Sequence, residues 1–250
     1  MSDISAVIIT FNEEKKLKDC LDSLSFANEI IVIDSNSADR TVQIAKDSGA
    51  KVISRQLDDF SSQKNFGISQ ARHGWILLID ADERVSGELK NEILEAVNKP
   101  SELVGYEVKR ENYIFKSRVR FGASIDDRQL RLIKKGKGLF QGLVHERIVP
   151  SGPVGLFENP LRHITYQNLD EYFSKFNVFT SLDAKEMVKQ GLKVTWFDVW
   201  VKPVISFVYF YFFKFGFLDG KAGLVYQGLS SYYIFVRSNK VLEYRRSAVS

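Results

Sequence analysis

The sequence predicts an α/β fold in which a mixed, mostly parallel sheet is flanked by helices and followed by an aromatic-rich helical C-terminal extension. Short apolar runs alternate with helical patterns along the first hundred residues, and the connections between them are short. This alternation is typical of an open α/β sheet with right-handed crossovers. The extension is predicted by its aromatic content, because many of the nineteen Phe and ten Tyr residues lie after position 172.

The first strand is predicted at residues 4–10, where a short β-branched apolar run is typical of a buried parallel strand. Leu17, Leu21 and Leu24 then repeat at the spacing of one helix face. Ser86 is the expected N-cap of a later helix. Further strands are predicted at 29–33, 51–53 and 75–79, and further helices from about 38–41 onwards, at 60–72 and at 86–97.

Beyond Pro100 the pattern changes to repeated short runs with strand-like alternation, which predicts an antiparallel or mixed extension of the sheet. These runs lie at 104–108, 113–115, 130–133 and 143–149. A Gly/Pro-rich break at 150–153 precedes a helical pattern at 168–190, an aromatic segment at 196–218 and a final amphipathic helix at 221–242. We therefore divide the chain into 1–100, 101–165 and 166–250.

The composition is that of a folded protein, because 44% hydrophobic and 26% charged residues exclude a disordered or collagen-like chain. The net charge of +4 is unevenly distributed: residues 109–147 contain eleven Lys/Arg and four Asp/Glu, a local charge of 11 − 4 = +7. Such an excess suits an anionic partner, namely a nucleotide diphosphate, a phosphorylated acceptor or an anionic lipid surface. A solvated basic face is the alternative.

Two features bear on the compartment. The single cysteine, Cys20, is spaced to pack on a helix as a small apolar residue, and no secretory h-region follows Met1. The expected location is therefore the reducing cytoplasm. The uncharged stretch 203–213 is about half the length that a membrane-spanning helix needs, so we do not expect it to span.

Polar clusters follow three of the predicted strands, at 10–13, 34–37 and 80–83. Ligands of open α/β sheets bind beyond the carboxyl ends of the strands. None of the three clusters is a glycine-rich phosphate loop, so a bound phosphate needs another counter-charge. Asp80 and Asp82, two residues apart, can present oxygens to Mg²⁺ or Mn²⁺, which in turn can hold a diphosphate. Taken alone, an Asp-x-Asp pair is more often a solvated turn.

Four segments in order carry a resemblance to a known family: VIITFNEE at 7–14, IVIDSNSADRT at 31–41, QKNFG at 63–67 and LIDADE at 78–83. Together they resemble the inverting glycosyltransferases of family 2, which have the GT-A (Rossmann-like) fold. KKGK at 134–137, VHE at 144–146 and GFLDGKAG at 216–223 are similar to the branch that glucosylates the lipopolysaccharide core. This second likeness is less specific.

The resemblance implies roles for the polar clusters. Residues 1–100 would form the nucleotide-sugar-binding half of the domain and 101–165 its acceptor and catalytic half. Asp82 would ligate the metal, Mg²⁺ or Mn²⁺. The residues that would bind the nucleotide-sugar are Thr10, Asn12, Glu13, Asp34, Lys64 and Asp80. A surface lysine is the alternative for Lys64, and Asp39 is as well suited to capping its helix as to touching ligand.

An inverting transfer needs a general base, because the acceptor hydroxyl loses its proton as it attacks the anomeric carbon. Glu146 is the predicted base, and its neighbour His145 would orient it, contact the diphosphate or complete the metal shell. The pair Asp126–Asp127 competes for the same role, although a surface turn suits it better. We interpret His163 and His73 as ordinary structural or surface residues.

The predicted function is the transfer of a hexose, with glucose as the first candidate, from a UDP-sugar to a lipid-linked saccharide such as the lipopolysaccharide inner core. The expected place is the cytoplasmic face of the bacterial inner membrane. No nucleic acid is expected as a partner. The aromatic residues and interleaved Lys and Arg of 166–250 suit an anionic membrane surface, and a homodimer contact is the alternative. The competing functions are a sugar nucleotidyltransferase and a non-catalytic sugar- or lipid-binding module.

Overall fold

The computed structural model describes residues 3–142 and 147–247. The chain divides into two compact units. Unit 1 comprises Met1–Arg110 and Arg128–His163, and unit 2 comprises Glu111–Asp127 and Ile164–Ser250. Unit 1 therefore contains the predicted strand ends, whereas unit 2 contains the aromatic segment.

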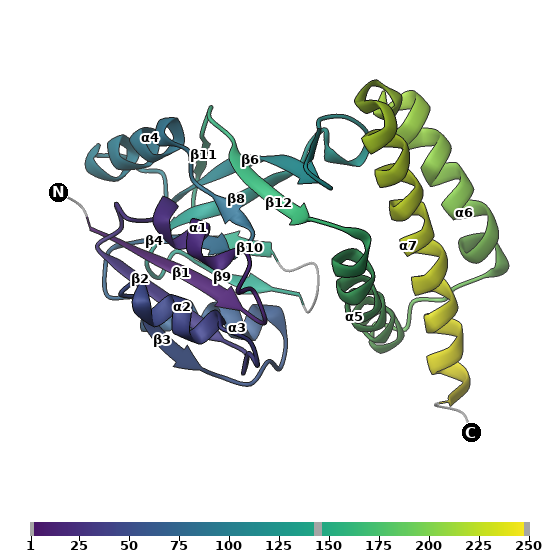
Figure 1. Ribbon diagram of the computed structural model, residues 1–250, viewed down its shortest axis with the longest axis horizontal. Helices are drawn as coiled ribbons and strands as arrows, with labels where there is room; N and C mark the ends of the chain where they lie inside the picture. Colours follow the sequence, from purple (N-terminus) through teal and green to yellow (C-terminus); the bar gives the residue numbers. More distant parts are fainter. Residues whose placement is uncertain (1–2, 143–146, 248–250) are drawn as a thin grey trace. The chain divides into compact units, whose positions relative to one another are not determined.

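Four parallel strands form one half of the sheet of unit 1 (Figure 1). They are β1 (Ile4–Thr10), β2 (Glu29–Asp34), β3 (Lys51–Ser54) and β4 (Trp75–Asp80), in the order β3-β2-β1-β4. Each coincides within one residue with a predicted strand, so the apolar β-branched runs are confirmed as strands.

Four helices connect and follow these strands: α1 (Leu17–Ser23), α2 (Thr41–Asp47), α3 (Phe60–Gln70) and α4 (Gly87–Asn98). Ser86 is confirmed as the cap of α4, because its side chain accepts a hydrogen bond from the backbone N of Leu89 at 3.2 Å. Cys20 is completely buried on α1, as a small apolar residue would be, and this burial raises the pKa of its thiol.

Both faces of the parallel half are buried. Ile4, Ala6 and Ile8 of β1 belong to one hydrophobic cluster, together with side chains of α1 and α4. Val7 points to the other face, where it joins Ile68 of α3 in a second cluster. A strand that is covered on both sides needs apolar residues at every position, which explains why the sequence shows continuous apolar runs here rather than alternation.

The other half of the sheet is mixed and follows β4 in the order β8-β6-β12-β5, in which β8 pairs antiparallel with both β4 and β6, and β12 pairs antiparallel with β5. These strands are β8 (Arg128–Lys134), β6 (Gly105–Ile114), β12 (Leu161–Tyr166) and β5 (Glu83–Arg84). The runs predicted separately at 104–108 and 113–115 are one strand, β6. The polar residues in the middle of β6 remain extended because this strand pairs with β8 and with β7. Nη1 of Arg110 lies 3.7 Å from Oε1 of Glu83.

Shorter strands complete unit 1 and the start of unit 2. β7 (Ser117–Val119) and β11 (Val154–Leu156) pair with β6, and β9 (Gly138–Gln141) pairs with β10 (Arg147–Pro150) as a separate two-stranded sheet. The run predicted at 143–149 is a strand from Arg147 onwards, and residues 143–146 lie outside the described part of the chain.

Unit 2 contains the helices α5 (Leu169–Lys189), α6 (Trp196–Val208) and α7 (Gly220–Ser247). α7 packs against both of the others, and Figure 1 shows it between them. The helices predicted at 168–190 and 221–242 are confirmed. Between α6 and α7, the aromatic segment continues as a π-helical turn, η2 (Tyr209–Phe213), and a 3₁₀ turn, η3 (Gly216–Asp219).

The segment GFLDGKAG at 216–223 has a structural explanation. A Cβ atom on Gly223 would lie 2.0 Å from the carbonyl oxygen of Gly216, so only glycine allows this close approach. The carboxylate of Asp219 accepts hydrogen bonds from the backbone N of Arg120 at 3.0 Å and of Phe121 at 2.9 Å. The motif therefore fastens the start of α7 to the loop after β7 within unit 2.

Among the described helices, none is by itself long and apolar enough to cross a membrane. The segments Trp196–Phe213 and Gly216–Ser247 meet the length and composition criterion together, with a bend of 75° between them.

Candidate active site

The carboxyl ends of the central parallel strands bring the predicted polar clusters together. Thr10 is the register partner of Asp34 between β1 and β2, and Ile9 is the partner of Asp80 between β1 and β4. Side chains from three distant parts of the sequence therefore meet at one edge of unit 1. This is the edge at which open α/β sheets bind their ligands.

Asp34 is completely buried at this edge. Its Oδ1 accepts hydrogen bonds from Thr10 Oγ1 at 3.0 Å and from Ser37 Oγ at 2.6 Å, and its Oδ2 accepts one from Ser37 N at 2.8 Å. Three such bonds satisfy a buried carboxylate and hold the connection from β2 to α2 in shape. The contact of Asp34 with a base or ribose stays a prediction.

The loop after β1 is fastened to the loop after β2. Asn12 lies in the left-handed region at φ 54°, which asparagine adopts more readily than most residues. Its backbone N donates to Ser37 Oγ at 2.9 Å, and its side-chain oxygen accepts from Ala38 N at 2.9 Å. The backbone N of Glu13 donates to Thr41 Oγ1 at 2.8 Å. Asn12 and Glu13 therefore lie at the predicted edge, with their nucleoside contacts still predicted.

Asp39 bridges the same two loops. Its carboxylate accepts hydrogen bonds from the backbone N of Glu14 at 3.2 Å and of Thr41 at 2.9 Å. Burial acts to raise the pKa of Asp39, but the hydrogen bonds from Thr41 and Glu14 outweigh it and lower this pKa. Of the two roles considered for Asp39, these contacts support the structural one.

Asp80 lies between two cations. Its Oδ1 is 2.9 Å from Nζ of Lys64 on α3, and its Oδ2 is 2.6 Å from Nη2 of Arg131 on β8. Burial acts to raise the pKa of Asp80, but the charges of Arg131 and Lys64 and their hydrogen bonds outweigh it and hold this pKa well below its ordinary value. Asp80 is therefore ionised at neutral pH, and the surface-lysine alternative for Lys64 is not supported, since Lys64 is only 7% exposed.

Arg131 and Glu83 extend this cluster into the protein. Arg131 Nη2 also forms an ion pair with Glu83 Oε1, and Arg110 Nη1 lies 3.7 Å from the same oxygen. The other oxygen, Oε2, accepts a hydrogen bond from the backbone N of Asp80 at 3.0 Å. Glu83 has no exposed surface and Arg131 is 4% exposed, so both charges depend on these partners. Burial acts to lower the pKa of Arg131, but the negative charges of Asp80 and Glu83 outweigh the effect of burial and raise this pKa.

The roles of Arg131 and Glu83 were not predicted. One signal was available, because Arg131 interrupts the apolar run Leu130–Ile133 that was predicted as a strand. A charged residue in a buried strand requires an opposite charge within contact distance. That signal does not identify the partner, which lies 48 positions away along the chain.

Asp82 lies beside a histidine. Oδ1 of Asp82 is 3.6 Å from Nε2 of His163, and the two side chains are 16% and 12% exposed. His163 belongs to β12, where it is the register partner of Glu83 in β5, so the short β5–β12 ladder sets this distance. Our interpretation of His163 as an ordinary structural residue did not anticipate this position. His73, by contrast, pairs with Asp3 through Nδ1 and Oδ2 at 3.4 Å, next to the start of β4.

The predicted base and its neighbour, Glu146 and His145, lie outside the described residues. The strand before them is fastened to α3, because the side chain of Asn65 exchanges two hydrogen bonds with the backbone of Phe140, at 2.8 and 3.0 Å. Nζ of Lys64 lies 5.2 Å from the ring centroid of Phe140. The helix that carries Lys64 therefore also positions β9.

The competing base candidates, Asp126 and Asp127, belong to unit 2. Asp127 accepts a hydrogen bond from Nδ2 of Asn112 at 2.9 Å, and Asp126 is exposed. Several lysines and arginines of the basic segment 109–147 have protein partners. Lys134 Nζ donates to the carbonyl of Ser101 and Lys135 Nζ to that of Ala71, at 2.9 and 2.7 Å. The excess of positive charge is thus partly structural.

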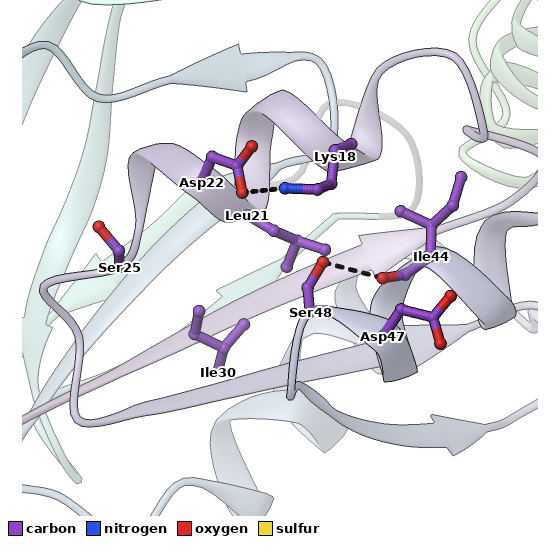
Figure 2. A pocket seen from close by; sticks show the side chains of 8 residues that line it. All are labelled: Lys18, Leu21, Asp22, Ser25, Ile30, Ile44, Asp47 and Ser48. Atoms are coloured by element: carbon purple, nitrogen blue, oxygen red, sulfur yellow. Dashed lines mark hydrogen bonds and ion pairs between the residues drawn. The ribbon is translucent and has the colours of Figure 1, made fainter.

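A cavity of about 320 Å³ opens between α1, α2 and the start of β2 (Figure 2). Figure 2 shows Lys18 and Asp22 joined by an ion pair and Ser48 donating to the carbonyl of Ile44 at 2.9 Å. None of the predicted site residues lines it. Because Ile30 at its wall belongs to the amino-terminal part of β2, the cavity is separate from the edge that carries Asp34.

Comparisons with known proteins agree on one family. The family model described as "Glycosyl transferase family 2" matches residues 5–150. The lipopolysaccharide core biosynthesis glycosyltransferase LpsC of Rhizobium meliloti is 32% identical over 94% of this chain and 92% of its own length. An uncharacterized glycosyltransferase of Rickettsia typhi is 30% identical over 97% of this chain and 88% of its own.

Among solved structures, glucosyl-3-phosphoglycerate synthase of Mycobacterium tuberculosis, in complex with Mn²⁺, UDP and glucosyl-3-phosphoglycerate, is similar with a TM-score of 0.51. The match covers 77% of this chain and 81% of that chain at 17% identity. It supports the predicted GT-A fold.

Proposed function

Because this chain belongs to glycosyltransferase family 2, we propose that it transfers a hexose, with glucose as the first candidate, from a UDP-sugar to a saccharide acceptor with inversion at the anomeric carbon. The observation that carries the proposal is the meeting of Asp80, Asp82 and Lys64 at the carboxyl end of β4. The family match at residues 5–150 includes all three.

Each member of the cluster has a proposed task. Asp80, kept ionised by Lys64 and Arg131, accepts hydrogen bonds from hydroxyls of the ribose or the sugar. Lys64 faces the base or the diphosphate, and Arg131 fixes the orientation of the Asp80 carboxylate. The nucleoside is bound by the loops that carry Thr10, Asn12, Glu13 and Asp34.

We propose Asp82 and His163 as the protein ligands of a divalent cation, Mg²⁺ or Mn²⁺. Among the described residues there is no cluster of three His, Cys, Asp or Glu side chains able to hold a metal ion, and Asp82 and His163 are the two ligands that we propose from this part of the chain. This fits a cation that takes its remaining ligands from water and from the phosphates of the substrate. When bound, the cation stabilises the negative charge of the diphosphate leaving group. Mn²⁺ and UDP in the solved synthase are properties of that enzyme; for this chain the proposal rests on its own carboxylate and imidazole.

The general base remains the proposed Glu146, with His145 beside it in sequence. We expect Glu146→Gln to leave UDP binding intact, since an amide keeps the size of the side chain, and to lower turnover by roughly 10²–10⁴-fold because it cannot accept a proton. UDP binding is measured by calorimetry and turnover by UDP release. Wild-type turnover in this variant would transfer the role to Asp126 or Asp127.

The proposed acceptor is a lipid-linked saccharide of the lipopolysaccharide inner-core type, because LpsC, whose name places it in lipopolysaccharide core biosynthesis, is similar over nearly the whole chain. An acceptor of this kind is anchored in a bilayer. The proposed place of reaction is therefore the cytoplasmic face of the bacterial inner membrane.

The decisive experiment incubates the protein with UDP-glucose, Mn²⁺ or Mg²⁺ and a lipid acceptor that carries Kdo or heptose, and follows UDP release. The expected result is release that requires both the metal and the acceptor. UDP-galactose and UDP-N-acetylglucosamine in parallel reactions test the choice of glucose.

Two other outcomes would overturn the proposal. Pyrophosphate formed from UTP and a sugar phosphate would identify a nucleotidyltransferase. Binding of UDP-sugar or lipid acceptor without turnover, for every donor and acceptor tried, would indicate a non-catalytic module.

A further inference from the structure

The outer side of α6 and of the turns that follow it is covered with exposed apolar side chains. We call Trp196–Asp219, which comprises α6, η2 and η3, the aromatic elbow. Trp196 is 71% exposed, Trp200 64% and Phe213 70%. Other large apolar side chains exposed in the elbow are Phe197, Val204, Ile205, Val208, Tyr209, Phe212, Phe215, Phe217 and Leu218. Patches of this kind mark interaction sites in folded proteins.

The packing of unit 2 accounts for only the inner side of α6. Val199 and Pro203 are buried, and α6 contacts α7, which in turn contacts α5 (Figure 1). Trp196, Trp200 and Val204 repeat every fourth residue, so they lie along one face of the helix. Since these three are exposed, that face is not covered by unit 2.

The charges of the elbow and α7 taken together favour an anionic partner. The acidic residues are used internally: Asp198 accepts hydrogen bonds from the backbone N and Oγ1 of Thr195, at 3.0 and 2.8 Å, and Asp219 fastens the loop after β7. The side chain of Lys202 is 52% exposed, and its Nζ lies 3.5 Å from Oδ1 of Asp198. The elbow itself has two Lys and two Asp, whereas residues 196–247, which include α7, have seven Lys/Arg and three Asp/Glu, a net charge of 7 − 3 = +4. Apolar surface with lysines along it suits the anionic headgroup region of a bilayer.

The bend within the elbow suits a segment that lies on a bilayer. The elbow and α7 together reach the length and apolar composition of a membrane-embedded segment, but they are bent by 75°. No described helix qualifies alone. Tryptophan and tyrosine are the residues that favour the membrane–water boundary. A bent, aromatic, lysine-bearing segment therefore suits one leaflet.

We propose that the aromatic elbow is an interfacial anchor that inserts into the headgroup and upper acyl region of an anionic lipid membrane without crossing it. Such an anchor would bring the enzyme to its proposed lipid-linked acceptor, and only this benefit rests on the proposed function. The binding itself follows from the exposed side chains and lysines of unit 2.

The test mixes the full-length protein with vesicles of phosphatidylcholine, with and without phosphatidylglycerol, and measures cosedimentation and tryptophan fluorescence. Trp196 and Trp200 are exposed, whereas Trp75 is 6% exposed in the core of unit 1. We expect binding to the vesicles that contain phosphatidylglycerol and a blue shift in emission, because Trp196 and Trp200 leave water while Trp75 does not change its surroundings. Absence of both the binding and the shift would overturn the proposal.

A matched pair of variants localises the binding. Val204 on α6 is 61% exposed and Val178 on α5 is 53% exposed. Val204→Glu should lower partitioning to the anionic vesicles by about tenfold or more, because it places a negative charge in the contact. Val178→Glu should leave partitioning unchanged. Equal partitioning of Val204→Glu and the wild type would overturn the proposal.

Further measurements separate the proposal from its rivals. If the wild type is a dimer in light scattering, Val204→Glu is a monomer and no vesicle binds, a second copy covers the elbow and the proposal fails. UDP binding should be the same in Val204→Glu and the wild type, which verifies that unit 1 is folded. Vesicle binding without any glycosyl transfer would overturn the proposed function and leave the anchor standing.

Discussion

The two units depart in opposite directions from the rule that charged side chains lie outside a protein and apolar ones inside. Unit 1 buries charge, since Glu83 has no exposed surface and Arg131 is only 4% exposed. Unit 2 exposes apolar surface, since Trp196 and Phe213 are 71% and 70% exposed. Neither departure is what packing alone would favour, and such departures concentrate where a protein binds something. We therefore propose the first region for the donor and the second for the lipid surface.

The largest effect is expected when the buried guanidinium of Arg131 is removed. Arg131→Met keeps much of the length of the side chain but leaves Glu83 buried without its ion pair to Arg131 and removes one partner of Asp80. We expect a loss of about 3–5 kcal/mol in the free energy of unfolding, the usual result when one partner of a buried ion pair is removed. Urea denaturation followed by circular dichroism measures it.

The control is an ion pair on the surface. Lys18 and Asp22 are neighbours on one turn of helix, and their side chains are 60% and 59% exposed. Asp22→Asn should change the free energy of unfolding by less than about 1 kcal/mol, because water screens the pair. If Arg131→Met costs no more than Asp22→Asn, the buried charges of unit 1 are not held by their pairing.

The next effect concerns the proposed metal ligands. We expect His163→Ala to weaken Mn²⁺-dependent UDP binding by roughly 10–100-fold, because the imidazole beside Asp82 is lost. Calorimetry with and without Mn²⁺ measures it. His73→Ala is the matched control, since His73 pairs with Asp3 away from Asp82. Equal Mn²⁺ dependence in both variants would exclude His163 from the metal site.

The part of this arrangement that could be predicted is encoded locally. The four parallel strands follow from short apolar runs, and the cap Ser86 follows from its place directly before an amphipathic pattern. Because parallel strands present their carboxyl ends at one edge, the meeting of Asp34 and Asp80 could also be expected from the sequence.

The part that could not be predicted depends on the register of strands far apart in sequence. His163 reaches Asp82 only because β12 pairs with the two-residue strand β5, and so short a strand has no periodicity of its own. The break inside the aromatic segment, between η2 and η3, was equally hidden. Phe215 adopts a left-handed conformation at φ 59°, which nothing in a run of aromatic residues indicates.

A smaller effect tests how unit 2 holds its own shape. We expect Asp219→Ala to lower the free energy of unfolding by about 1–2 kcal/mol, because the backbone N–H groups of Arg120 and Phe121 lose their acceptor. Asp219→Asn should lose less, since its amide oxygen still accepts. Denaturation followed by tryptophan fluorescence compares the two. An equal loss in the two variants would mean that the negative charge of Asp219, which both remove, fastens the loop rather than its hydrogen bonds.

The smallest effect is expected at Val204, on the exposed face of α6. Val204 is 61% exposed, so it gains little from burial when the chain folds. We expect Val204→Ser to change the free energy of unfolding by no more than about 0.5 kcal/mol, measured by urea denaturation, and to leave UDP binding unchanged. If Val204→Ser leaves the free energy of unfolding unchanged but weakens vesicle binding, the side chain of Val204 contributes to membrane contact and not to the packing of the fold. A loss of more than about 1 kcal/mol would instead mean that the outer face of α6 is covered in the folded protein, and the contrast between the units would disappear.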